Sequence, residues 1–200
     1  MHRLAGACCV AILLSAYPAR AQVIEFESNG LKYQTLARSG VTVMFATLAF
    51  RLKSYAVMQV AVENGSQSPY IIRPEDFTFL RADGVSVRAA TANSVVQMLT
   101  ESGSRSDVLK LVNEYEAALY GIPNMRSTNG FEQRRQAALM FGPSKLRAAA
   151  AASAVALVQT RLPAGESSDG AVFFPTNGKP LGAGHLVIRT STDTFEFKQQ

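Results

Sequence analysis

Histidine and cysteine, the side chains that most often bind metals or act as nucleophiles, are scarce in this chain of 200 residues. Both cysteines, Cys8 and Cys9, lie in the first ten residues, and His185 is the only histidine after position 2. A zinc site needs three or four nitrogen, sulfur or oxygen ligands, and no such set is patterned around His185. We therefore predict no metal site, and we expect His185 to be a partly exposed residue of an edge strand.

Serine nucleophiles and phosphate-binding loops also lack their usual surroundings in this sequence. A serine hydrolase needs an activating base, and the Gly-x-Ser-x-Gly elbow that many of these enzymes use is absent. The stretch Gly182-Ala183-Gly184 lacks the lysine and the following serine or threonine of a P-loop. We therefore predict neither a serine hydrolase nor a bound cofactor.

Carboxylates are the remaining candidates for acid–base chemistry. Glu75 and Asp76 are adjacent and follow Pro74, where hydrogen bonding within a turn is the favoured role. An enzyme would need two or more convergent carboxyl groups in a concave pocket, drawn from Glu75, Asp76, Glu114 or Glu132. We predict that no residue is catalytic, and a carboxylate-dependent glycan hydrolase stays the alternative.

Residues 1–21 have the three parts of a cleavable export signal. Arg3 gives a short positive start, Leu4–Leu14 is an apolar run, and Ala19 and Ala21 have the spacing that signal peptidase accepts. The apolar run is well short of the roughly 20 residues that cross a bilayer. We therefore predict an exported protein, periplasmic or extracellular, whose mature chain begins at Gln22 and has no transmembrane segment.

Removal of this signal would change the chemistry of the chain. The mature protein would contain no cysteine, and so neither a disulfide nor a thiolate nucleophile. The loss of Arg3 and Arg20 leaves 18 basic residues against 15 acidic ones, which lowers the net charge from +5 to +3. Because no long run of lysine or arginine is present, we do not expect nucleic acid as a partner.

Two zones of the sequence have the pattern of β-strands. In residues 22–91 and 162–200, apolar and polar residues alternate between turn signals such as Asn64-Gly65 and Asp83-Gly84. The two zones hold roughly seven to nine short strands, the number typical of a sandwich. We predict one β-sandwich domain over residues 22–200, with strands near 31–36, 41–51, 55–63, 70–72, 76–80, 85–87, 170–174, 185–190 and 194–198.

Residues 92–161 interrupt this pattern with apolar residues at helical spacing, so we predict a helical insertion in the sandwich. About four helices are expected, near 94–101, 106–120, 129–142 and 143–160. Asn93 is the expected cap of the first helix, and Ser106 with Asp107 begins the second.

The β zones also contain an ordered set of motifs: Tyr55–Asn64, Pro69-Tyr70, Pro74-Glu75-Asp76-Phe77, Asp83-Gly84, Leu162-Pro163-Ala164-Gly165-Glu166, Gly170-Ala171-Val172-Phe173-Phe174 and Phe195–Phe197. This order resembles the telokin-like, immunoglobulin-like domains of many uncharacterised exported bacterial proteins. The resemblance covers roughly half of the mature chain and not the helical insertion. It implies an immunoglobulin-like antiparallel β-sandwich and brings no catalytic residues with it.

The fourth predicted helix carries an uncharged, alanine-rich run, 148–158. Leu146, Ala150, Ser153 or Ala154, and Leu157 would form a seam of small and apolar side chains. The seam is either an interface with another chain or, as we favour, the face that packs against the 106–120 helix.

Opposite this seam the insertion is basic. Its arginines and lysine form a possible interaction surface for an acidic ligand such as an envelope polyanion, although a solvated helix face is the favoured interpretation. The surface consists of Arg126, Arg134, Arg135, Lys145 and Arg147.

These observations predict an exported, non-enzymatic binding or structural domain whose ligand is unknown. The expected partner is a protein or a component of the cell envelope, contacted through the helical insertion, because sandwich folds place recognition on loops and insertions. The alternatives are the glycan hydrolase and a chaperone-like module whose exposed strand edge pairs with a partner.

Overall fold

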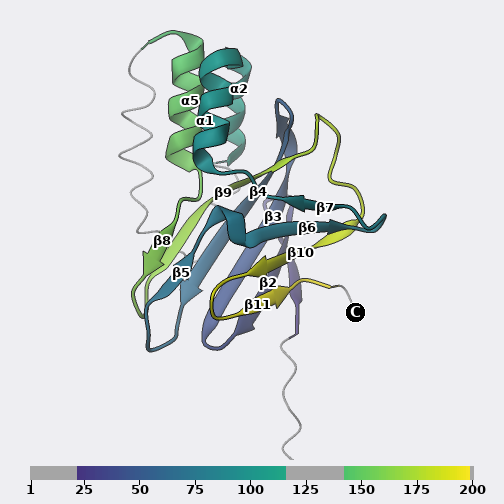
Figure 1. The fold of residues 1–200 in the computed structure, drawn as a ribbon, viewed down its shortest axis with the longest axis vertical. Coiled ribbons are helices and arrows are strands. Elements are labelled where there is room, and N and C mark those ends of the chain that lie inside the picture. The colour runs from purple at the N-terminus through teal and green to yellow at the C-terminus, as the bar shows by residue number, and fades with distance from the viewer. Residues whose placement is uncertain (1–21, 116–141, 199–200) are drawn as a thin grey trace, which may run out of the picture.

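The structure is a computed structural model that describes residues 22–115 and 142–198; the predicted export signal, residues 1–21, lies outside these ranges. The described chain is mostly antiparallel β-structure, with a group of helices at one end (Figure 1). The five-stranded sheet has the order β1 (Ile24–Ser28), β2 (Leu31–Arg38), β3 (Val41–Leu52), β4 (Tyr55–Asn64) and β9 (Ser167–Pro175). The four-stranded sheet has the order β11 (Thr194–Glu196), β10 (Gly184–Arg189), β6 (Phe77–Arg81) and β7 (Ser86–Arg88). A two-stranded sheet pairs β5 (Tyr70–Ile72) with β8 (Thr160–Leu162).

Strands β1 to β4 are neighbours because tight turns join them. Asn29 and Gly30 have φ values of 50° and 74°, and Ser39 and Gly40 have values of 51° and 79°. Two successive positive φ values define the hairpin turn whose twist matches that of the flanking strands. Every strand predicted from the sequence is present with slightly shifted ends, whereas β1 and β8 were not predicted.

A first hydrophobic core lies between the five-stranded and four-stranded sheets. Side chains from one face of each sheet are buried together, as alternation along the strands requires. The edge-to-face ring pair Phe45 and Phe197, whose centroids are 4.9 Å apart, joins the two sheets across this core. Its aromatic members are Phe45, Tyr70, Phe77, Phe79, Phe174, Phe195 and Phe197.

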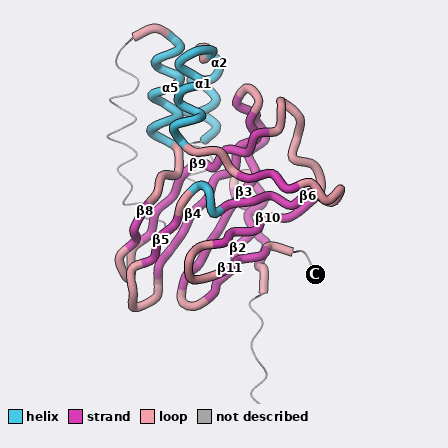
Figure 2. The backbone as a smooth tube through the Cα atoms, viewed as in Figure 1, coloured by secondary structure: helices cyan, strands magenta, loops and turns pink. Residues whose placement is uncertain are grey.

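Strand β3 changes the face that it buries. Val43 and Phe45 point into the core between the sheets, whereas Leu48, Phe50 and Leu52 belong to a second core. The pairing of β3 with β4 also shifts in register beyond Thr47. The five-stranded sheet is therefore covered on both faces at this end, by the other sheet and by the helices (Figure 2).

The helical insertion supplies the other half of the second core. Its described part contains α1 (Ala92–Ser102), α2 (Arg105–Leu109), one turn of π-helix named η2 (Lys110–Glu114), and α5 (Ser144–Val155). It thus has three α-helices, not the four that the sequence predicted, and the predicted 129–142 helix lies outside the described residues. Leu99, Leu111 and Val155 bury their side chains against the sheet residues Val57 and Phe173 within this core.

Two predicted helix starts were wrong by one or two residues because a nearby hydroxyl is the better cap. The Thr91 side chain accepts from the Ser94 backbone N–H, so α1 begins before Asn93. Ser104 caps α2 by accepting from the Asp107 N–H, and the Asp107 carboxylate accepts from the Ser104 N–H in return. This reciprocal arrangement is a capping box.

Helix α5 ends earlier than predicted, and only part of the predicted seam is buried. Leu146 and Ser153 are exposed and Ala150 is half-buried, whereas Ala154 and Leu157 are buried. The buried side chains are Ala148, Ala149, Ala151, Ala152, Ala154 and Val155, and the helix packs against both α1 and α2. Sequence spacing alone did not separate these two faces because small uncharged residues occur on both.

Both ends of the insertion are fixed to the same strand. The Ala90 N–H donates to the Phe173 carbonyl at 2.8 Å, and the Leu157 N–H donates to the Ala171 carbonyl at 2.8 Å. The chain after α5 lies so close to β9 that a Cβ on Gly170 would come within 2.5 Å of the Leu157 Cα. Only glycine fits at this crossing.

Asn64 joins the turn after β4 to the turn before β9. Its Nδ2 donates to the carbonyls of Ser68, Leu162 and Pro163, at 2.8, 3.0 and 3.0 Å. Its Oδ1 accepts from the N–H and the hydroxyl of Ser66. The Asn64 side chain is fully buried, so two of the sequence motifs, although almost one hundred residues apart, are parts of one hydrogen-bonded junction.

Candidate functional site

The predicted basic surface is only partly described. Arg126, Arg134 and Arg135 lie outside the described residues. Lys145 and Arg147 lie in the first turn of α5, and both are exposed. The structure adds Arg105, which begins α2 and which the sequence did not single out.

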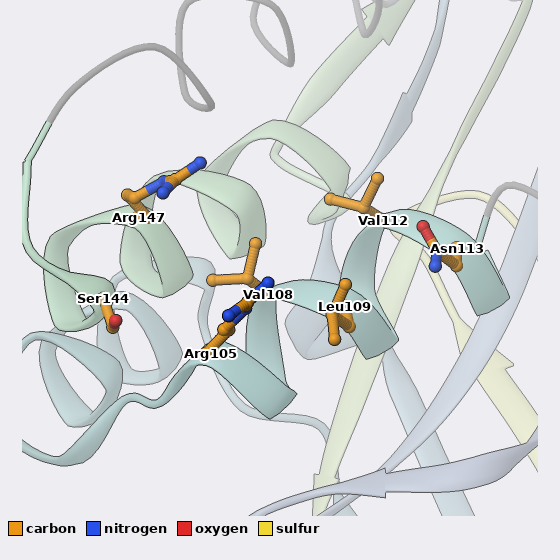
Figure 3. Close-up of a pocket in the computed structure, with 7 residues that line it drawn as sticks. All are labelled: Arg105, Val108, Leu109, Val112, Asn113, Ser144 and Arg147. Carbon is orange, nitrogen blue, oxygen red and sulfur yellow. The ribbon is translucent and has the colours of Figure 1, made fainter.

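Arg105 and Arg147 line a groove of about 560 Å³ between α2–η2 and α5. Among the described residues, the groove is also lined by Val108, Leu109, Val112, Asn113 and Ser144. Figure 3 shows Arg105, Ser144 and Arg147 toward one end, Asn113 at the other end, and the three apolar side chains between them.

The groove lining follows from helix periodicity. On α2 and η2 the lining positions recur three, four, seven and eight residues after Arg105, which places them on one face. Ser144 and Arg147 are three residues apart on α5 and therefore share a face of that helix. Leu109 is 50% exposed, so the apolar part of the groove opens to solvent.

Polar contacts hold α2 and η2 on the sheet and so fix the position of the groove. The Lys53 ammonium, in the β3–β4 turn, lies 3.1 Å from Oδ2 of Asp107, whose side chain is only 5% exposed. The Lys110 ammonium donates to the Arg51 carbonyl at 3.2 Å. In the first of these contacts the carboxylate is shielded from water, which strengthens the attraction between the two charges, although the Lys53 side chain is 33% exposed.

Beyond η2, the buried Tyr115 hydroxyl donates to Oδ2 of Asp169 on β9 at 3.1 Å. Helix η2 itself is a π-helical turn, a rare element that is frequently found at functional sites. The groove is therefore built on a segment that contacts the sheet on either side of the π-helical turn.

We expect Asp107→Ala to destabilise the protein by about 2 kcal/mol, because it removes the capping box and leaves the Lys53 ammonium without its carboxylate. Chemical denaturation would measure the change. Asp83→Ala is a matched control, since it removes the 2.8 Å Arg81–Asp83 ion pair, in which both side chains are a third or more exposed. Such a pair contributes about 0–1 kcal/mol. Equal losses in the two variants would contradict an anchoring role for Asp107.

The charges and shape of the groove suit an anionic and partly apolar ligand. Two guanidinium groups and the nearby Lys145 give the α5 end positive charge, and planar guanidinium donors match carboxylate and phosphate oxygens. Val108, Leu109 and Val112 offer apolar contact beside these charges. Among the described residues, the lining contains neither a carboxylate nor a histidine to act as a general base.

The described carboxylates that could have formed an active site are divided between two short helical elements, η1 and η2. Glu75 and Asp76 lie in the short helix η1 (Pro74–Asp76) between β5 and β6, Glu114 ends η2, and Glu132 is outside the described residues. Asp76 accepts from the Arg73 N–H at 2.9 Å, the turn hydrogen bond that its position after Pro74 predicted. Burial, partly offset by that hydrogen bond, raises the pKa of Asp76.

His185 lies on β10, between β11 and β6, so the prediction of an edge strand was wrong. Its Nε2 is 3.4 Å from Oε1 of Glu196, which lies 2.8 Å from the Lys198 ammonium. The Lys198 hydrogen bond lowers the pKa of Glu196, with a smaller contribution from His185. In the described ranges, no group of three or more histidine, aspartate or glutamate side chains is placed to hold a metal ion.

Tyr33 and Gln59 form a buried polar pair on the five-stranded sheet. The Tyr33 hydroxyl donates to Oε1 of Gln59 at 3.2 Å, and both side chains are almost fully buried. Burial raises the pKa of Tyr33 to about 12, so the phenol is neutral at physiological pH.

Among the helices of the described chain, none is both long and apolar enough to cross a lipid bilayer.

Comparison of this chain with protein-family models, with curated proteins and with solved structures finds no match.

Proposed function

We propose that this protein is an exported, non-enzymatic binding domain, whose helical insertion binds an acidic and partly apolar segment of another protein. The groove between α2–η2 and α5 is the observation that carries the proposal, because it combines two arginines with an open apolar floor. An acidic amphipathic helix is the favoured ligand, since it would place carboxylates on the arginines and apolar side chains on Leu109.

The proposal includes an immunoglobulin-like sandwich, which the strand pairing supports. In a constant-type domain, strands A, B, E and D form one sheet and strands C, F and G form the other. Assigning A, B and E to β3, β4 and β9, and C, F and G to β6, β10 and β11, reproduces the pairing of these six strands. Strands β1 and β2 then precede the domain's first strand, and the insertion follows β7.

A non-enzymatic role is supported by the distribution of titratable groups. None of Glu75, Asp76 and Glu114 lines the groove, and Asp76 is engaged in its own turn. Export is supported by the signal-like residues 1–21.

The test is a pull-down from envelope extract with the mature chain, comparing wild type with the double variant Arg105→Glu and Arg147→Glu. We expect recovery of the partner to fall about tenfold, because reversing two charges at the groove repels an acidic ligand. Deleting the insertion is unsuitable for this test, since it would expose Phe50, Leu52 and Phe173.

The matched control is Arg161→Glu with Arg189→Glu, which makes the same change of net charge at exposed positions on β8 and β10. Its recovery should equal that of wild type. Equal recovery with the groove variant would contradict the proposal, and recovery of an anionic envelope lipid or glycan instead of a protein would replace the proposed ligand.

A further inference from the structure

We propose that the outer edge of β1 is a second docking site, at which an extended basic segment of a partner protein adds a strand to the five-stranded sheet. This site is separate from the groove of the insertion and belongs to the opposite edge of the sheet from β9.

Strand β1 ends the five-stranded sheet, and it is the most open edge among the described strands. At the other end of that sheet, Ala156 forms a parallel bridge to Ala171 of β9 and so occupies that edge. The end strands of the four-stranded sheet, β7 and β11, have only three residues each. Strand β1 has five residues, none of them buried, and Ile24 is 61% exposed.

The hairpin turn determines which backbone groups of β1 face outward. In a two-residue hairpin the pair next to the turn exchanges both hydrogen bonds, and the pairs then alternate. That first pair is Ser28 with Leu31, so Phe26 and Ile24 also direct their N–H and carbonyl groups toward β2. Glu25 and Glu27 direct theirs away from β2, toward an incoming strand.

The side chains of Glu25 and Glu27 select the charge of that strand. Both point to one face of the sheet, and residues of an added strand that lie opposite them would point to the same face. The Glu25 carboxylate accepts from Nε2 of Gln34 at 2.6 Å. Lysine or arginine is therefore favoured opposite these positions, and aspartate or glutamate is disfavoured.

The same charges argue against pairing between two copies of this protein. An antiparallel pair centred on Phe26 would set Glu25 of each copy opposite Glu27 of the other, and like charges in direct opposition destabilise a strand pair. On the other face, Ile24 is exposed and Phe26 stacks on Tyr33 with ring centroids 5.2 Å apart. The partner strand therefore alternates basic residues with apolar ones that cover Ile24 and Phe26.

The probe is a synthetic seven-residue peptide that alternates valine and lysine, and its control replaces each lysine with glutamate. With the mature wild-type chain, we expect only the lysine peptide to bind by fluorescence anisotropy, and the amides of Glu25 and Glu27 to gain protection from hydrogen exchange. The double variant Glu25→Lys and Glu27→Lys should bind the lysine peptide about tenfold more weakly and gain binding of the glutamate peptide.

Glu27→Pro tests the backbone contribution, because proline at an outward-facing edge position removes only the N–H that a new strand would use. It should weaken peptide binding at least about fivefold, while Arg105→Glu with Arg147→Glu should leave peptide binding unchanged. The proposal is overturned if the two peptides bind wild type equally, if protection appears in residues 105–113 instead, or if wild type dimerises through the β1 amides without peptide.

Discussion

Asn64→Ala is expected to cost about 3 kcal/mol of stability and to lower the melting temperature by about 10 °C. The side chain makes five hydrogen bonds at a fully buried position, and its removal takes the Nδ2 donor away from the buried carbonyl of Leu162. Thermal and chemical denaturation of the mature chain would measure the loss. Asn113→Ala, at an exposed position, is the matched control and should change stability by less than about 0.5 kcal/mol.

Asn64→Asp removes the Nδ2 donor but keeps the side-chain volume, so it separates the effect of the lost hydrogen bonds on stability from the effect of the lost volume. The variant keeps an acceptor for Ser66 but points a carboxylate oxygen at three carbonyl oxygens, so at pH 7 it should be less stable than Asn64→Ala. Burial beside these carbonyls would raise the pKa of the new carboxyl in the folded state. Its destabilisation is therefore complete only above the raised folded pKa and decreases as the pH falls from there toward the unfolded pKa of about 4. A loss below about 1 kcal/mol for Asn64→Ala would contradict the role given to this junction.

Gly170→Ala is expected to destabilise the protein by about 3 kcal/mol or more, the upper range for overpacking a core. The added Cβ would lie 2.5 Å from the Cα and 2.6 Å from the N of Leu157, and these are backbone atoms that cannot rotate away. Any relief must move the 156–157 segment off β9 and break the Leu157 N–H bond to Ala171. The loss would appear in denaturation and in faster amide exchange at Leu157.

Two further variants isolate the steric cause. Gly165→Ala meets no atom within 4 Å but has φ at +78°, so it reports backbone strain alone, about 1 kcal/mol. Leu157→Ala combined with Gly170→Ala should not recover stability, because the closest contacts are with backbone atoms. Recovery in that double variant would show that side-chain crowding, and not the backbone crossing, determines the cost.

The strands were predictable from the sequence because alternation and turn residues are local signals. The Asp83-Gly84 hairpin and the strand after Tyr55 were confirmed on that basis. Strand β1 was missed although Ile24 to Glu27 alternate and Asn29-Gly30 is a strong hairpin signal. The segment is only five residues long and follows directly on the predicted export signal, so its short pattern was not separated from its surroundings.

The helical insertion was harder to predict in detail because its contacts are tertiary. The alanine-rich helix has no distinct apolar stripe, so which side it buries depends on α1 and on Gly103, where a Cβ would lie 2.9 Å from that of Ala148. Helix α5 ends at Val155 because the chain then bonds to β9, which no local signal encodes. The sequence placed Arg147 on a basic surface but did not single out Arg105. Only the packing of α2 beside α5 brings these two arginines together.

Two hydrogen bonds fix the ends of the insertion, from Ala90 to Phe173 and from Leu157 to Ala171, so both ends lie at the same place on β9. The entropy cost of closing a segment with adjacent ends grows only with the logarithm of its length. Evolution or design can therefore lengthen, shorten or exchange the segment between these two points at little cost in closure entropy. A replacement must still cover Leu48, Phe50 and Phe173. Its length and its outer surface can therefore vary, but it must keep an apolar face toward the sheet.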